Sequence, residues 1–151
     1  MKLPLTVLDF RRPPLPAESR QMAADLQGVH VLVVDDEPDT RELVSMVLGN
    51  CGAEVRTAAS AAEALQLVEK ASPDVLLIDI QMPGEDGYCL IRKIRALERE
   101  KGLRIRAAAL TAYVTSSDRS QALSAGFEAH VAKPVEPAEL AAVVAQLAKT
   151  A

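Results

Sequence analysis

The segment Val31–Asp36 reads Val-Leu-Val-Val-Asp-Asp and decides the fold of this chain, because it is a short apolar run that ends in two acidic residues. Four apolar residues in a row, without alternation, are typical of a strand that is buried on both faces. Parallel sheets with helices on both sides contain such strands, and the carboxyl ends of these strands line the ligand crevice. Asp35 and Asp36 are therefore expected at a binding site.

Three further apolar runs in the chain also end in a polar residue, namely Asp79, Thr111 and Lys133. Parallel strands place their carboxyl ends at one edge of a sheet, so the four endings would bring three carboxylates, a hydroxyl and an ammonium group together. That set of groups can hold a divalent cation and receive a phosphoryl group.

Segments with helical spacing separate the apolar runs, and this alternation predicts an α/β fold with a parallel sheet. The strands are expected at 29–35, 53–57, 74–79, 105–111 and 129–133. The helices are expected at 38–49, 60–71, 87–100, 116–125 and 136–148. In the first helix, the i, i+3, i+4 spacing predicts a core-facing stripe made of Thr40, Leu43, Val44, Val47 and Leu48, with Met46 outside it.

The first part of the chain, residues 1–27, differs from the rest because four of the nine prolines fall within its first sixteen residues. Such spacing suits an extended linker. Residues 17–27 could form a short helix, which Gly28 would end. We therefore expect a Pro-rich linker over residues 1–27 and a single domain over residues 28–149.

The composition narrows the classes of partner. The chain has 151 residues, of which 49% are hydrophobic, and a formal net charge of -4 with a pI of about 5.2. An acidic balance argues against nucleic acid as the main partner, since phosphate contacts need many Lys and Arg side chains. No stretch approaches the length of a membrane span, so we expect a cytoplasmic protein without membrane contact.

The predicted site needs a cation. Two of its carboxylates at about 4 Å would repel each other by about 4 kcal/mol at an effective dielectric constant of about 20. Lys133 can offset one charge, and Mg²⁺, or alternatively Mn²⁺, can offset two more. Asp36 and Asp79 are expected as direct ligands, Asp35 as a ligand through a metal-bound water, and the backbone carbonyl of Gln81 as a further oxygen donor.

Asp79 is the candidate nucleophile, because it ends the central strand and a carboxylate can attack phosphorus to form an acyl phosphate. Phosphoryl transfer mainly needs in-line positioning and neutralisation of the equatorial oxygens. The metal, the ammonium group of Lys133 and the hydroxyl of Thr111 are expected to contact one oxygen each.

Four motifs in this order and spacing resemble the receiver domain of two-component response regulators. They are Val31–Glu37, Asp79–Gly87, Leu110–Ala112 and Lys133–Pro134. The resemblance covers residues 29–148. The segment that leads into it also resembles the junction before the carboxyl-terminal receiver of a hybrid sensor histidine kinase, with a stand-alone receiver as the alternative.

The resemblance implies a doubly wound, flavodoxin-like sheet of five parallel strands in the order 2-1-3-4-5. It implies a phosphoacceptor signalling domain that is not an enzyme, in which a histidine kinase or histidine phosphotransfer domain phosphorylates Asp79 with Mg²⁺. The Lys133–Pro134 peptide bond would be cis. The domain would be a monomer or a phosphorylation-dependent dimer, with its first helix as the donor dock.

The resemblance also assigns a switch and two residues that tune the lifetime of the phosphoryl group. Thr111 would turn toward the phosphoryl group, and the residue three positions before Lys133 would rotate inward behind it. That residue is His130, where the family usually has Tyr or Phe. Gln81 and Tyr113 occupy the lifetime positions, and the bulk of Tyr113 predicts slow hydrolysis.

Two other functions remain open. A phosphohydrolase of the haloacid dehalogenase kind also uses an aspartate nucleophile, but it needs Asp-x-Asp after its first strand, and Asp79-Ile80-Gln81 lacks the second acid. A degenerate receiver that only binds proteins would be expected to lack an acidic residue, the threonine or the lysine, and none of these is missing.

Overall fold

The computed structural model describes residues 25–112 and 115–149, and in these ranges five strands alternate with five helices. The strands are β1 His30–Val34, β2 Glu54–Ala58, β3 Val75–Asp79, β4 Arg106–Thr111 and β5 Ala129–Ala132. The helices are α2 Pro38–Asn50, α3 Ala61–Lys70, α4 Gly87–Lys101, α5 Ser116–Ala125 and α6 Pro137–Lys149. Each of these boundaries lies within one residue of the predicted one.

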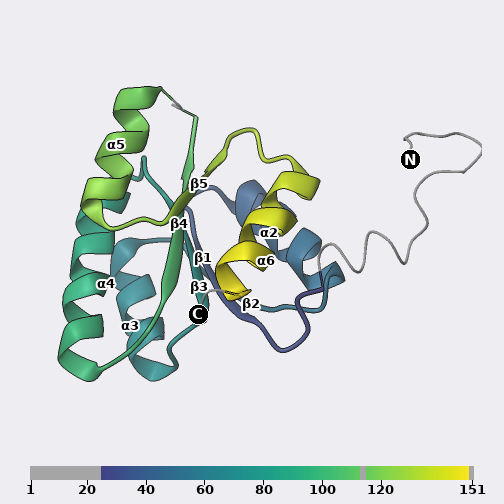
Figure 1. Ribbon diagram of the computed structural model, residues 1–151, viewed down its shortest axis with the longest axis horizontal. Coiled ribbons are helices and arrows are strands. Elements are labelled where there is room, and N and C mark those ends of the chain that lie inside the picture. The colour runs from purple at the N-terminus through teal and green to yellow at the C-terminus, as the bar shows by residue number, and fades with distance from the viewer. Residues whose placement is uncertain (1–24, 113–114, 150–151) are drawn as a thin grey trace, which may run out of the picture.

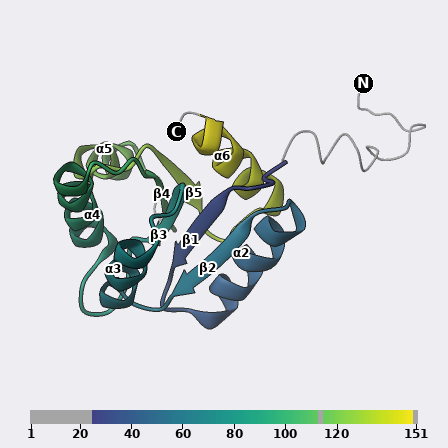
Figure 2. The same ribbon diagram turned by 90° about the horizontal axis from the view of Figure 1, so that it is seen from below.

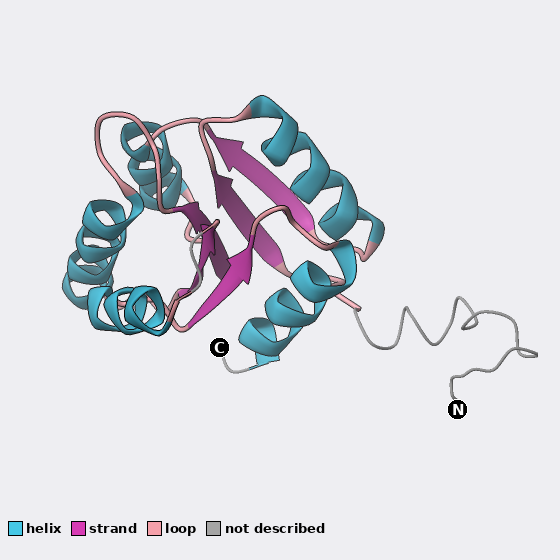
Figure 3. Ribbon diagram, turned by 90° about the horizontal axis from the view of Figure 1, so that it is seen from above, coloured by secondary structure: helices cyan, strands magenta, loops and turns pink. Residues whose placement is uncertain are grey.

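The five strands form one parallel sheet in the order β2-β1-β3-β4-β5, as predicted. Helices α2 and α6 cover one face of the sheet, and α3, α4 and α5 cover the other (Figures 1 and 2). This arrangement is the doubly wound three-layer fold (Figure 3). The chain reverses its direction of winding between β1 and β3, so the carboxyl ends of these two strands border the crevice where such folds bind ligands.

The two central strands are buried on both faces, which explains their continuous apolar sequences. Every residue of β3 is buried, as are Val31 to Val34 of β1. In β1, Leu32 and Val34 belong to the hydrophobic cluster beneath α3, α4 and α5, whereas Val31 and Val33 belong to the cluster beneath α2 and α6. A polar residue inside these runs would lose its water without a partner, so polar residues occur only where the strands end.

The hydrophobic core includes a residue that precedes Gly28. Leu26 is completely buried in the cluster beneath α2 and α6, and its N–H donates a hydrogen bond to the carbonyl of Cys51 at 2.8 Å. Residues 25–27 are not helical, so the end of the helix predicted at 17–27 is wrong, and the rest of that prediction lies outside the described residues. Sequence patterns missed Leu26 because its burial depends on contacts with distant segments.

The core-facing stripe of α2 is narrower than predicted. Val44 and Leu48 are completely buried, but Leu43 is 37% exposed. Met46, which was predicted to lie outside the stripe, is 57% exposed. The helix packs through its i, i+4 line, and Leu43 lies at the edge of that line, toward solvent.

Helix ends follow local signals. Pro38 and Pro137 are the first residues of α2 and α6, where the missing proline N–H costs no hydrogen bond. The carboxylate of Asp86 caps α4 by accepting the N–H of Cys89 at 3.0 Å. Within the described ranges, no helix is long and apolar enough to cross a membrane.

Candidate functional site

Backbone hydrogen bonds hold the polar strand ends side by side. The N–H of Ile80, directly after Asp79, donates to the carbonyl of Leu110 at 3.1 Å. The N–H of Lys133 donates to the carbonyl of Thr111 at 2.9 Å. These bonds continue the sheet by one residue beyond the apolar part of each strand, so the side chains of the strand ends share one edge.

Three carboxylates meet at this edge. One oxygen from each of Asp35, Asp36 and Asp79 can be chosen so that the three lie within 4.8 Å of one another. Asp35 is completely buried and Asp79 is 3% exposed, whereas Asp36 is exposed. Carboxylate oxygens are preferred ligands of hard divalent cations such as Mg²⁺, and a cation usually keeps several waters, for which the exposed side of Asp36 leaves room. The donor set therefore fits a magnesium ion.

The side chain of Lys133 reaches across the cluster. Its Nζ lies 3.0 Å from Oδ2 of Asp35 and 3.3 Å from Oδ1 of Asp79. One ammonium group among three ionised carboxylates leaves a formal charge of minus two. A doubly charged cation would balance the cluster.

This excess charge affects protonation. Burial and the neighbouring Asp35 carboxylate raise the pKa of Asp79 from 3.8 to about 6, although Lys133 and the Gln81 N–H lower it. Burial lowers the pKa of Lys133, but its contacts with Asp35 and Asp79 outweigh burial and raise it. The cluster thus favours the uptake of a proton or a metal cation at its carboxylates.

The loop after β1 is fixed by two hydrogen bonds of Asp35. Its Oδ1 accepts the N–H of Glu37 at 2.9 Å, and its backbone carbonyl accepts Nη1 of Arg41 at 2.7 Å. Asp36 lies between these contacts in the chain. The loop on which Asp36 stands is therefore held in place by the buried acid before it and by the first turns of α2.

The loop after β3 is held close to Asp79. Oδ1 of Asp79 accepts the N–H of Gln81 at 3.1 Å, and the N–H of Gly87 donates to the carbonyl of Ile80 at 3.0 Å. A Cβ atom at Gly87 would lie 2.6 Å from the backbone oxygen of Asp79. Only glycine permits this approach, so α4 begins in direct contact with the strand end that carries the candidate nucleophile.

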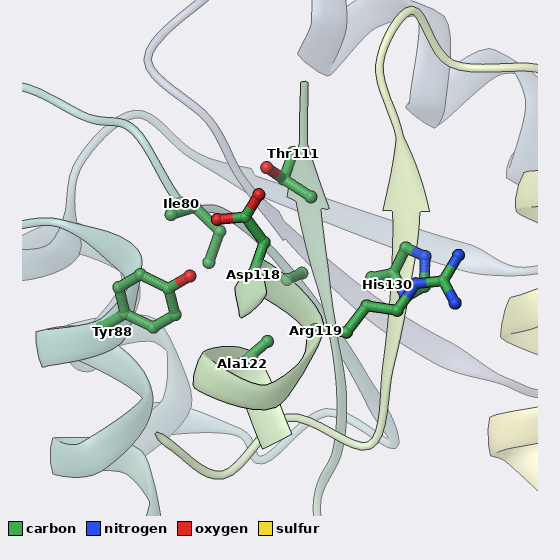
Figure 4. A pocket seen from close by; sticks show the side chains of 8 residues that line it. Ile80, Tyr88, Thr111, Asp118, Arg119, Ala122 and His130 are labelled. Carbon is green, nitrogen blue, oxygen red and sulfur yellow. The ribbon is translucent and has the colours of Figure 1, made fainter. Parts of the chain in front are cut away.

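Two pockets adjoin the strand ends. The first is lined by two of the three clustered acids, Asp36 and Asp79, and by Glu37, Gln81, Ala112 and Lys133. The side chain of Thr111 borders the second pocket, which lies toward α5 and includes His130 (Figure 4). The structure thus brings the predicted acids and the lysine together, while the predicted hydroxyl stands on the adjacent side of β4.

Other predicted positions have varied outcomes. The Lys133–Pro134 peptide bond is cis, the isomer that the resemblance implies. Tyr113 lies outside the described residues, so its role stays a prediction. Three residues near the site had no predicted role: Glu37 and Gly87, which lie at the ends of two of the motifs, and Arg41, which lies in none. Gly87 had a signal, since it follows Asp86 at the start of a helix where glycine is otherwise unfavourable, but the contact of Arg41 had none.

The fold and this edge together define a class of protein: a doubly wound five-stranded α/β domain with an acidic, lysine-containing site at the ends of its central strands. Residues 31–145 match the family described as response regulator receiver domain. The chain belongs to this family.

Relatives of known sequence include an uncharacterized 14.6 kDa protein from Leptolyngbya boryana, which is 46% identical over 121 residues, covering 80% of this chain and 91% of that protein. The sensor histidine kinase RcsC of Escherichia coli K12 is 33% identical over 121 residues, covering 80% of this chain but only 12% of the kinase. The chain thus spans nearly all of the first relative and about an eighth of the second.

Solved structures agree with this family. The chemotaxis protein CheY4 of Vibrio cholerae is 29% identical, with a TM-score of 0.73 over 79% of this chain and 98% of that one. A CheY-like receiver domain protein from Methanospirillum hungatei is 27% identical, with a TM-score of 0.72 over 81% of this chain and 94% of that one.

Proposed function

We propose that this receiver domain accepts a phosphoryl group on Asp79 from a phosphohistidine, with Mg²⁺ bound beside it, and that phosphorylation changes its conformation. The observation that carries the proposal is the buried Asp79 carboxylate, which contacts Lys133 and shares a site with Asp35 and Asp36. In this proposal the domain works in the cytoplasm as a signalling element and not as an enzyme.

Asp79 acts as the nucleophile. The Gln81 N–H and the Lys133 ammonium group both contact Oδ1 of Asp79, so Oδ2 is the oxygen that we expect to attack. A new P–O bond forms as the P–N bond of the phosphohistidine breaks, and the electron pair of that bond stays on the imidazole nitrogen. The product is an acyl phosphate on Asp79.

The remaining site residues neutralise charge. Asp36, Asp79 and the Gln81 carbonyl would hold Mg²⁺ directly and Asp35 through a water. The bound ion supplies positive charge to the phosphoryl oxygens. Lys133 contacts a second oxygen from its position between Asp35 and Asp79. To contact a third phosphoryl oxygen, the Thr111 side chain would need to turn away from the second pocket. This rotation would be the first conformational change of the switch.

The donor is a histidine kinase or a histidine phosphotransfer domain, and α2 is its proposed dock. Leu43 and Met46 are exposed on this helix, which begins two residues after Asp36. Exposed apolar side chains beside a reactive site are typical of protein contact surfaces. The likeness to part of RcsC supports an origin as the receiver of a hybrid kinase.

The test is phosphorylation by a small donor. The protein is incubated with acetyl phosphate and Mg²⁺, and intact mass is measured. We expect a single phosphoryl adduct that is absent with EDTA and absent in Asp79→Asn. Asp74→Asn is the matched control, because Asp74 directly precedes β3, the strand that Asp79 ends, and lies at the opposite edge of the sheet. An unmodified protein would favour the scaffold function, and rapid turnover of donor without an adduct would favour the phosphohydrolase.

A further inference from the structure

The second pocket lies between the end of β4 and the first turns of α5. It is lined by side chains from five elements or loops, among them Ile80, Tyr88, Thr111, Asp118, Arg119 and His130 (Figure 4). Thr111 stands at its upper side and Asp118 below it, while Tyr88 enters from α4. The pocket therefore connects the strand end nearest the phosphorylation site with two helices.

Tyr88 is the phenol of this pocket. Its hydroxyl is directed toward Asp118 in Figure 4, and its ring meets the ring of Phe127 edge to face, with 6.5 Å between centroids. Burial raises the pKa of Tyr88, and the nearby carboxylates of Asp118 and Asp86 raise it further. The hydroxyl thus stays protonated near neutral pH, as a donor that faces a carboxylate.

The backbone of Tyr88 is coupled to the strand end that carries Asp79. The preceding residue is Gly87, whose close contact with the Asp79 carbonyl leaves no room for a Cβ atom. Any shift of the β3 end or of its loop must therefore displace the first turn of α4, and with it Tyr88.

One side of the pocket is rigid. Arg95 of α4 donates to the carbonyl of Gly126 at 3.0 and 2.8 Å and pairs with Glu128 at 2.8 Å. Glu128 in turn accepts the N–H of Ala107 at 2.7 Å. These bonds tie the segment that contains Phe127 to both α4 and β4. The ring of Tyr88 therefore packs against a phenylalanine whose position is fixed.

The side of the pocket formed by α5 has few buried apolar contacts. Helix α5 buries only two alanine side chains, Ala122 and Ala125, and leaves Leu123 62% exposed. Elements with few buried apolar groups open or shift at low cost. In the first turn of α5, the Asp118 carboxylate accepts the N–H and the hydroxyl of Thr115 at 3.2 and 2.7 Å. This turn is therefore a closed unit that can shift as a whole against the pocket.

His130 lies across the pocket from Tyr88, on the side of Arg119 (Figure 4). Strand β5 thus lines the pocket with an imidazole, while the phenol that faces α5 comes from α4.

We propose that Tyr88, and not the side chain on β5, transmits phosphorylation of Asp79 to helix α5. The inference rests on the proposed function, because it needs an acyl phosphate at Asp79. When Thr111 turns toward the phosphoryl group it vacates its side of the pocket, the Tyr88 hydroxyl changes its position relative to Asp118, and the first turn of α5 shifts.

The native fluorescence of Tyr88 gives a direct test. The chain has two tyrosines and no tryptophan, so Tyr113→Phe leaves Tyr88 as its single tyrosine. Beryllofluoride with Mg²⁺ mimics the phosphoryl group without hydrolysing, and we expect tyrosine emission to change in step with occupancy and to stay constant when Asp79→Asn is added. Constant emission in a protein that mass spectrometry shows to be phosphorylated by acetyl phosphate would overturn the inference.

A second measurement separates transmission from a structural role. Amide hydrogen exchange across residues 116–122 is expected to change on phosphorylation by about fivefold or more, the lower end of usual coupling between sites. Tyr88→Phe keeps the ring, so we expect it to take up phosphoryl groups equally well but to lose the exchange response, whereas His130→Ala retains it. The reverse pattern would overturn the inference. A parent chain that accepts no phosphoryl group would overturn the proposed function, and the inference with it.

Discussion

Replacing Asp79 by asparagine is expected to make the metal-free protein more stable at neutral pH. The carboxyl group of Asp79 has a pKa of about 6 instead of 3.8, chiefly because of burial and then because of Asp35. Each pKa unit corresponds to about 1.4 kcal/mol, so ionised Asp79 costs the folded state about 3 kcal/mol. Asparagine removes this cost and can still accept the Gln81 N–H, and Lys133 keeps its contact with Asp35 at 3.0 Å.

The sign of the pH dependence follows from proton binding. The folded state binds the Asp79 proton more tightly than the unfolded chain does, so the wild type loses stability relative to the variant as the pH rises from about 4 to about 6. The difference in free energy of unfolding should be below about 1 kcal/mol at pH 4 and about 3 kcal/mol above pH 7. Adding Mg²⁺ at a hundred times its dissociation constant should stabilise the wild type by about 2.7 kcal/mol and the variant less, so the gap narrows.

Urea denaturation followed by circular dichroism, in EDTA and in Mg²⁺ at pH values between 4 and 8, measures these differences. Asp74→Asn, which also replaces one carboxylate but lies outside the cluster of Asp35, Asp36 and Asp79, is the matched control. Asp79→Asn could instead be less stable than the wild type in EDTA at pH 8. The ion pair of Asp79 with Lys133 would then outweigh the cost of burying Asp79 and its repulsion by Asp35. The conclusion that the cluster carries an unfavourable excess of negative charge would be wrong.

Four further predictions test other parts of the molecule. Gly87→Ala should lower the free energy of unfolding by about 1–3 kcal/mol, since its Cβ would meet the Asp79 carbonyl at 2.6 Å; urea denaturation measures this, and an unchanged midpoint would contradict it. Leu26→Ala should cost about 2–5 kcal/mol by the same assay, because Leu26 is completely buried; a cost near zero would place the domain boundary at Gly28. Met46→Arg should slow phosphotransfer from a histidine phosphotransfer domain but not from acetyl phosphate, and equal effects on both donors would exclude α2 as the dock. Tyr113→Ala should shorten the half-life of the phosphorylated protein in a decay assay, and an unchanged half-life would remove Tyr113 from the site.

The fold could be predicted closely because its signals are local. An apolar run buried on both faces cannot contain a polar residue, so Asp35, Asp79 and Thr111 mark where three strands end, and the boundaries follow within one residue. The weakest signal belonged to β2, an edge strand whose sequence Glu54–Ala58 mixes charged and apolar residues. Both ends of β2 lie one residue later in the structure than predicted, because no apolar run marks where the strand starts.

The residues that sequence patterns missed are those whose roles depend on distant contacts. Leu26 is buried through a hydrogen bond and packing with a segment 25 residues away, at Cys51. Arg95 resembles any surface arginine in a charged helix, yet its guanidinium group donates to the carbonyl of Ile105, just before β4, and to that of Gly126, after α5. The Thr111 side chain lines the second pocket and not the one with the carboxylates. The sequence does not predict which pocket it lines, because both pockets are formed by segments that lie far apart in the chain.

A cluster with an excess of two negative charges is unfavourable, and a protein can keep it only if other parts of the fold supply the stability. The two central strands do so, because their residues are buried in both hydrophobic clusters and depend on no charge at the site. Real proteins break local rules at functional sites and compensate elsewhere. Since the unfavourable groups stand at the ends of the most buried strands, any cation or phosphoryl group that relieves them acts on the rigid centre of the sheet, and the displacement it causes can be absorbed only by lightly held elements such as α5.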